Sequence, residues 1–92
     1  MDPERISDYN ISDVVKATAG RDRDELFYVI ALDGEYLTLA NGKDRPLDRP
    51  KRKKCKHVQK VLRSETRVAN RLRAGDKVLN SELRRDLANL AG

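Results

Sequence analysis

Ninety-two residues suffice for one small domain with a thin core, and they leave little room for a deep catalytic cleft. The formal net charge is +5, but residues 1–48 hold six basic and eleven acidic side chains, whereas residues 49–92 hold fourteen basic and four acidic ones. This asymmetry indicates a basic face for nucleic acid or another anionic surface.

The first half of the chain predicts short β-strands. After an N-terminus over residues 1–10 that we expect to be flexible, side chains alternate with period two from Asp13 to Ala19, and a polar loop follows. Residues 26–32 are almost continuously apolar and rich in β-formers, which is typical of a central strand. Asp33-Gly34 then predicts a tight hairpin turn into a strand over residues 36–40.

Two further strands are expected before the tail. Asn41-Gly42 repeats the hairpin signal, and residues 44–47 predict a short strand that Pro46 and Pro50 confine to an edge. Residues 57–61 predict a fifth strand. Short strands joined by tight turns indicate a small barrel or a partly open sheet. The expected core comprises Val15, Ala17, Phe27, Val29, Leu37, Leu39, Leu47 and Val58.

The tail changes to helical spacing. Residues 61–72 predict a first helix, which residues 74–76 end. A second helix is expected to begin at Asn80 or Ser81, either of which accepts hydrogen bonds from free N–H groups, with Glu82 in the first turn. Its apolar stripe either packs on the barrel, which we favour, or docks a partner. The stripe comprises Leu79, Leu83, Leu87 and Leu90.

The stretch from Arg49 to Arg63 holds eight Lys or Arg residues and no Asp or Glu. Because such a run repels itself, it is stable only as a solvated mobile loop or when it faces a polyanion. Here it lies between predicted strands, so a loop held at both ends presents its charges in one direction. The candidate phosphate contacts are Arg49, Lys51, Arg52, Lys53, Lys54, Lys56 and Lys60.

Residues outside this stretch bear on the same surface. Arg21, with Arg23, Lys43 and Arg45, extends the positive charge unless the aspartates beside these residues pair with them. The aromatic residues Tyr28 and Tyr36 either stack on nucleobases or pack in the core, and core packing is the commoner use.

The residue types argue against catalysis and against a metal site. The single cysteine, Cys55, and the single histidine, His57, are two positions apart, but nucleophilic catalysis also needs an orienting group and an oxyanion site. No set of three or four metal ligands lies nearby. We expect Cys55 to be a small buried filler and His57 to face phosphate or solvent. The alternating charges of residues 22–25 are more typical of a solvated loop than of an acid–base site.

Five segments share the pattern of a known RNA-binding motif: residues 13–22, 27–30, 41–43, 45–47 and 50–57. Together they resemble the small bacterial KOW-domain RNA-binding proteins, which are similar to the archaeal and eukaryotic large-subunit ribosomal protein of type fourteen. The resemblance covers roughly residues 10–62. One departure is the loop after Asp22, which is usually basic and contains glycine but here reads Arg23-Asp24-Glu25.

The resemblance implies an SH3-like barrel over residues 11–62, binding to ribosomal or other structured RNA, and no cofactor. A helical tail over residues 63–92 follows it. Gly20 matches the motif glycine between the first two strands, and Arg21 lies in the loop that approaches RNA in this family. The family's basic segment is matched by Lys51, Lys53, Lys54, Lys56 and His57.

We therefore expect a non-catalytic RNA-binding module whose partners are ribosomal RNA or ribonucleoprotein components. A cytoplasmic location is expected because there is one cysteine, no apolar run long enough to span a bilayer and no secretory signal in residues 1–4. One alternative is an SH3-like adaptor that binds proteins in a translation or transcription complex. Another is DNA binding by the tail helices, with Arg84 and Arg85 on the second helix.

Overall fold

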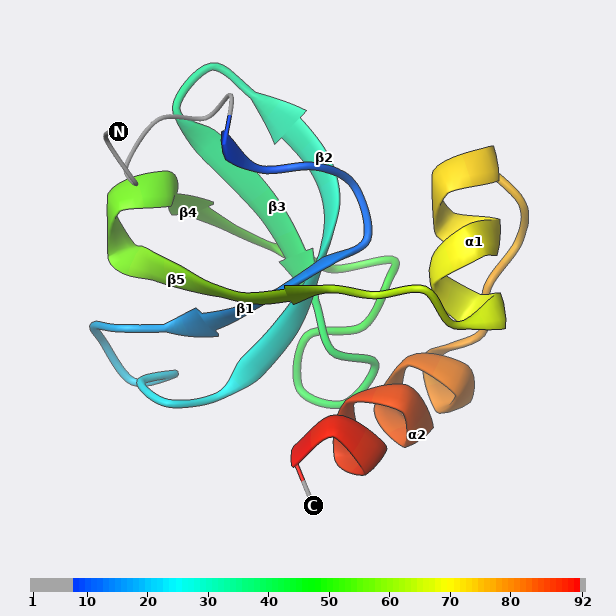
Figure 1. Ribbon diagram of the computed structural model, residues 1–92. Helices are drawn as coiled ribbons and strands as arrows, with labels where there is room; N and C mark the ends of the chain where they lie inside the picture. Colours follow the sequence, from blue (N-terminus) through cyan, green and yellow to red (C-terminus); the bar gives the residue numbers. More distant parts are fainter. Residues whose placement is uncertain (1–7, 92) are drawn as a thin grey trace.

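The computed structural model describes residues 8–91, which form one antiparallel sheet with two helices after it. The strands follow the order β4-β3-β2-β1-β5 in the curved sheet of Figure 1. The short 3-10 helix η2 (Cys55–His57) joins the two edge strands, and no hydrogen-bonded ladder closes the sheet between them in the described residues. The expectation of a mainly β fold with two C-terminal helices is confirmed. The elements are β1 (Asp13–Ala17), β2 (Leu26–Asp33), β3 (Tyr36–Ala40), β4 (Lys51–Lys54), β5 (Val58–Arg63), α1 (Arg67–Ala74) and α2 (Asn80–Ala91).

The concave side of the sheet holds the core that the alternating pattern predicts. All the expected core residues except Leu47 belong to one buried cluster. Cys55 joins this cluster, as expected of a buried filler, and so does Tyr9, which the sequence placed in the segment before the domain. The Tyr9 hydroxyl donates to the Val58 carbonyl at 3.3 Å. Residues 1–7 of the expected flexible N-terminus lie outside the described residues.

The expected strand over residues 44–47 is wrong, because this segment is a loop. The Asn41 side-chain oxygen accepts hydrogen bonds from the backbone N–H groups of Lys43 and Arg45, at 2.9 and 3.0 Å. These local bonds compete with strand pairing. The fourth strand is instead β4, so the middle of the basic stretch is an edge strand and not a loop.

Helix α1 begins later than the periodicity predicts, because β5 continues through Arg63. The side chain of Thr66 caps α1 by accepting from the N–H of Ala69 at 3.1 Å. Gly75 ends the helix in a left-handed conformation, as the sequence indicated. Helix α2 begins at Asn80, but the side-chain oxygen of Asn80 accepts from the N–H of Leu47 at 2.8 Å. Asn80 therefore ties the β3–β4 loop to the helix.

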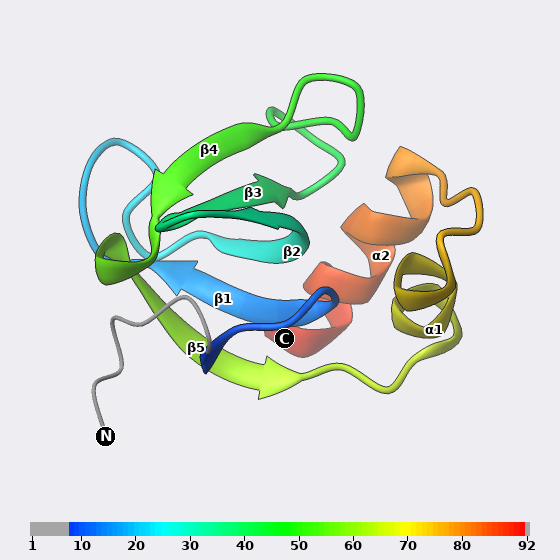
Figure 2. The ribbon, with the colours of Figure 1, turned by 90° about the horizontal axis from the view of Figure 1, so that it is seen from above.

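The two helices pack beside the sheet on its outer face (Figures 1 and 2). Leu83 and Leu87 of α2 are buried in a second cluster with Tyr28 and Ala40, so the stripe packs on the protein's own sheet. The other two stripe residues, Leu79 and Leu90, are 52% and 38% exposed. No helix in residues 8–91 is long and apolar enough to cross a membrane.

A partly buried hydrogen-bond network links α2 to the sheet and to the turn before α1. The Tyr28 hydroxyl donates to the Asp86 carboxylate at 2.6 Å and lies 2.9 Å from the Ser64 hydroxyl. The Thr66 hydroxyl donates to the same Asp86 oxygen at 2.6 Å. Burial, followed by the hydrogen bond to Asp86, raises the pKa of the Tyr28 phenol. Tyr28 is therefore a core residue and not a platform for nucleobases.

Helix α2 also contacts the β3–β4 loop at Gly42. The Arg84 guanidinium donates to the Gly42 carbonyl at 2.6 Å, and a Cβ atom on Gly42 would lie only 2.2 Å from the Asn80 carbonyl oxygen. Gly42 has a φ of +75°, which side chains rarely adopt. The absence of a side chain here lets the helix approach the loop that leads into β4.

We expect Gly42→Ala to lower the free energy of unfolding by about 3 kcal/mol, because a backbone clash is added to the cost of a positive φ. Gly34→Ala is the matched control, since Gly34 has a φ of +61° and open space around it. This control is expected to cost about 1 kcal/mol. Urea unfolding followed by circular dichroism measures both values, and equal losses would contradict the close approach of α2.

Candidate nucleic-acid interface

The cations of β4 point alternately to the two faces of the sheet. Lys51 and Lys53 lie opposite Leu39 and Leu37 in the register with β3, and their side chains are half-buried and buried. Arg52 is exposed and Lys54 half-buried on the other face. A strand of four consecutive cations therefore presents only two of them outward.

The inward lysines bind the β1–β2 loop. The Lys51 ammonium forms an ion pair with the buried carboxylate of Asp22. The Lys53 ammonium, on a residue that is 9% exposed, donates to the Ala19 carbonyl at 2.7 Å. Gly20, next to Ala19, has a φ of +84°, which side chains rarely adopt, whereas a Cβ there would lie at an ordinary contact distance of 3.6 Å from the Lys53 nitrogen. Lys51 and Lys53 hold the loop against β4 and are not free for a ligand.

The packing of the inward lysines lowers the pKa of both Asp22 and Lys53. The hydrogen bond from Lys51 lowers the pKa of Asp22 below its ordinary value of 3.8, against the opposing effect of burial. Burial, followed by the charge of Lys51, lowers the pKa of Lys53. Asp22 is thus held as a carboxylate, which compensates the lysines that the strand turns inward.

On the outer face, Tyr36 lies between the two outward cations. The Arg52 guanidinium carbon is 4.5 Å from the centre of the Tyr36 ring, and the Lys54 nitrogen is 5.9 Å from it. Both distances are within the range of cation–π attraction. Arg52 also makes a loose, exposed ion pair with Asp33 at 3.4 Å. Stacking on a nucleobase remains an alternative for Tyr36, which is half-buried, and is excluded for Tyr28, which is fully buried.

Of the remaining predicted site residues, four lie in or near the loops and η2, and Lys60 lies on β5. Arg21, Arg49 and Lys56 are exposed, and His57 is half-buried in η2. Lys60 lies on the opposite edge strand, where its ammonium is 3.1 Å from the buried Asp13 carboxylate and 5.5 Å from the centre of the Tyr9 ring. Lys60 is therefore part of the structure that anchors the N-terminal segment.

Arg45 does not extend the outward surface. Its side chain is half-buried, and its charge adds to the larger effect of the Lys51 hydrogen bond in lowering the pKa of Asp22. Between Arg49 and Lys56, the outward cations are thus Arg49, Arg52, Lys54 and Lys56.

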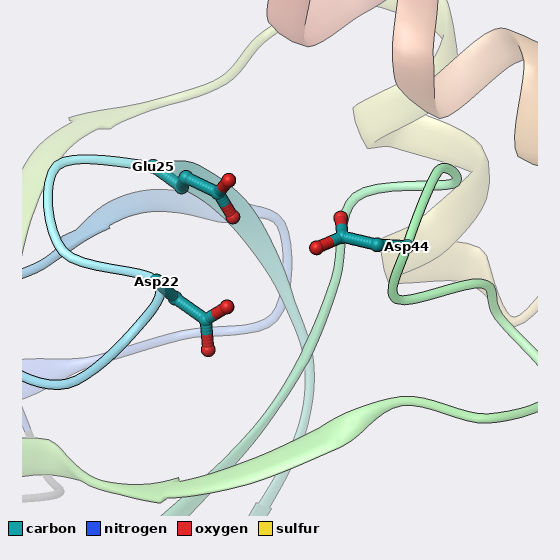
Figure 3. Close-up of side chains that lie close together, drawn as sticks. All are labelled: Asp22, Glu25 and Asp44. Atoms are coloured by element: carbon teal, nitrogen blue, oxygen red, sulfur yellow. The ribbon is translucent and has the colours of Figure 1, made fainter.

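Three acidic side chains, one of them Asp22, form a cluster. One carboxylate oxygen from each of Asp22, Glu25 and Asp44 lies within 4.8 Å of the others, and the three side chains face one another in Figure 3. Asp22 already accepts a hydrogen bond from Lys51, while Glu25 and Asp44 are exposed. The hydrogen bond from Lys51, with the charges of Lys51, Arg45 and Lys53, lowers the pKa of Asp22.

The inward direction of Lys51 and Lys53 does not follow from the charge pattern, which predicts a loop in which every cation has the same access to solvent. The two-residue period of an extended chain does indicate it, since Lys53 and Cys55 then share one face and Cys55 is expected to be buried.

Neither the protein-family models nor the curated proteins contain a match to this chain.

Asp22→Asn is expected to lower the free energy of unfolding by about 2 kcal/mol at pH 7, because a buried ion pair loses one charge. A carboxyl with a lowered pKa stabilises the fold above its unfolded pKa, near 3.8, and this contribution disappears as the pH falls through the lower folded value. The gap between wild type and variant should therefore narrow from pH 5 toward pH 2 in urea unfolding. A gap that is constant with pH would contradict the ion pair.

Neighbouring lysines of β4 are expected to respond differently to charge reversal. Lys53→Glu places a buried carboxylate beside the Ala19 carbonyl, and we expect a loss of about 3 kcal/mol or more. Lys54→Glu, on the outer face, is expected to change the free energy of unfolding by about 0.5 kcal/mol or less. Thermal unfolding measures both, and similar losses in the two variants would contradict the assigned directions.

Proposed function

We propose that the protein is a non-catalytic RNA-binding module that contacts RNA phosphates through the outward cations of the basic stretch. The observation that carries this proposal is the edge strand β4, on which Arg52 and Lys54 point outward while Asp22 neutralises the inward Lys51. Arg49 and Lys56 flank the strand and are exposed. A strand edge with this arrangement holds its cations in a fixed direction, as phosphate recognition requires.

We propose in addition that the domain is an SH3-like barrel and that its ligand is ribosomal or another structured RNA. The strand order and the 3-10 helix between β4 and β5 support an SH3-like barrel that is open between these strands. The resemblance of residues 10–62 to KOW-domain proteins supports ribosomal or another structured RNA as the ligand, in the cytoplasm. Phosphate contacts supply affinity and do not choose a sequence.

Two alternatives lose support from the contacts of the tail. Leu83 and Leu87 of the apolar stripe are buried against the protein's own sheet, which leaves less apolar surface for an adaptor function. Arg84 donates to the Gly42 carbonyl, so one of the two arginines considered for DNA binding is engaged within the chain.

The test is the salt dependence of RNA binding. Four phosphate contacts predict that log K falls with log salt at a slope of about −3 to −4. The double variant Lys54→Gln with Lys56→Gln should reduce this slope by about 1.5 to 2 and weaken binding about equally for unrelated RNA sequences. Fluorescence anisotropy with a labelled 20-nucleotide RNA stem-loop, titrated from 50 to 200 mM KCl, measures both quantities.

The matched control is Lys77→Gln with Arg85→Gln, which removes two exposed charges from the tail. It should leave the slope within about 0.5 of wild type, since the effect depends on neutralised phosphates and not on net charge. Equal effects of the two double variants would show that binding is unspecific attraction to a basic protein. Recovery of protein partners without RNA after crosslinking in cell extract would favour the adaptor alternative.

A further inference from the structure

The outer face of the sheet is covered at one end only. Tyr36, Thr38 and Ala40 of β3 share this face, because side chains two residues apart point the same way. Ala40 is buried in the cluster that includes α1 and α2, whereas that cluster does not reach Tyr36. Tyr36 and Thr38 are half-buried, and so is Ala31, which pairs with Thr38. The half-buried ring of Tyr36 thus lies on the same uncovered part of the face as the small side chains of Thr38 and Ala31.

The Arg52 guanidinium beside this ring is exposed, and its ion pair with Asp33 is weak. The Arg52 side chain is 59% exposed, and its ion-pair partner Asp33 is 79% exposed. Exposed ion pairs of this kind contribute little to stability, so the guanidinium can move at small cost. Because Tyr36 pairs directly with Lys54 and Arg52 pairs with Thr38, the guanidinium reaches the ring along the diagonal between the strands.

We infer that Tyr36 and Arg52 form a stacking platform for an unpaired nucleobase, so that the RNA is single-stranded where it crosses β3 and β4. The inference rests on the proposed function and names the ligand of the same surface. Aromatic rings and guanidinium planes both stack on bases, and every base has a face for them. A base inside a duplex has both faces covered by its neighbours, which excludes it from this platform.

The surrounding charges set the path of the RNA backbone. Asp33 and Glu35 are exposed at the β2–β3 turn beside Tyr36 and repel a phosphate that crosses the turn. Arg49 precedes β4 and Lys56 follows it, with Lys54 between them. The backbone therefore runs along the β4 edge, and one base turns inward over Tyr36.

The experiment compares a single-stranded 10-nucleotide oligouridine, carrying one central 2-aminopurine, with an RNA duplex of the same length. We expect wild type to prefer the single strand and to quench the 2-aminopurine fluorescence on binding. Tyr36→Leu should weaken single-strand binding roughly 10-fold or more and abolish the added quenching, with an unchanged salt slope. Tyr36→Phe, which keeps the ring, should retain both properties, and duplex binding should not respond to either substitution.

A second variant keeps the test independent of the folding of Tyr36→Leu. Arg52→Lys preserves the charge but removes the guanidinium plane, and should weaken single-strand binding about 3- to 10-fold at an unchanged salt slope. Wild-type affinity and quenching in both Tyr36→Leu and Arg52→Lys would overturn the platform while leaving the proposed function intact. Equal or stronger wild-type binding of the duplex would also overturn it. Failure of wild type to bind either RNA would overturn the proposed function itself.

Discussion

The pairing of β4 with β3 is the contact on which the arrangement of this protein depends. A strand of four cations is an unfavourable partner for a sheet, because two of its side chains must turn toward the core side. Asp22 and the Ala19 carbonyl accept these two side chains and so compensate their charge and their lost hydration. The same contacts hold the β1–β2 loop against the edge of the sheet, so one set of interactions shapes both the loop and the basic surface.

The helical tail supports this edge from the other side. Helix α2 contacts the β3–β4 loop through Asn80 and Arg84, and this loop leads directly into β4. The half-buried Asp86 carboxylate, which accepts hydrogen bonds from the Tyr28 and Thr66 hydroxyls, fixes the same helix to the sheet. The tail thus covers the part of the outer face that lies away from Tyr36. Its contacts also hold the β3–β4 loop in place before β4.

Much of the fold follows from local pattern. Alternation with period two correctly predicts the inward residues of β1 and β3, because a half-buried strand must place apolar side chains on one face, and the continuous apolar run of residues 26–32 predicts β2. The expected strand over residues 44–47 is a loop, since the hydrogen bonds of the Asn41 side chain override a weak strand propensity. Helix α1 begins only at Arg67, because the apolar residues that fit a helical period before it belong to the end of β5.

The sequence by itself determined that a dense block of positive charge lies next to a small β-rich core, and that the aspartates are concentrated before it. Only the tertiary structure decided which cations face outward. Charge is a property of each residue, but direction depends on the register of β4 against β3, which places Lys53 opposite Leu37 and Lys54 opposite Tyr36. A shift of one residue would reverse these roles, so the basic run becomes an oriented surface only when the strands pair.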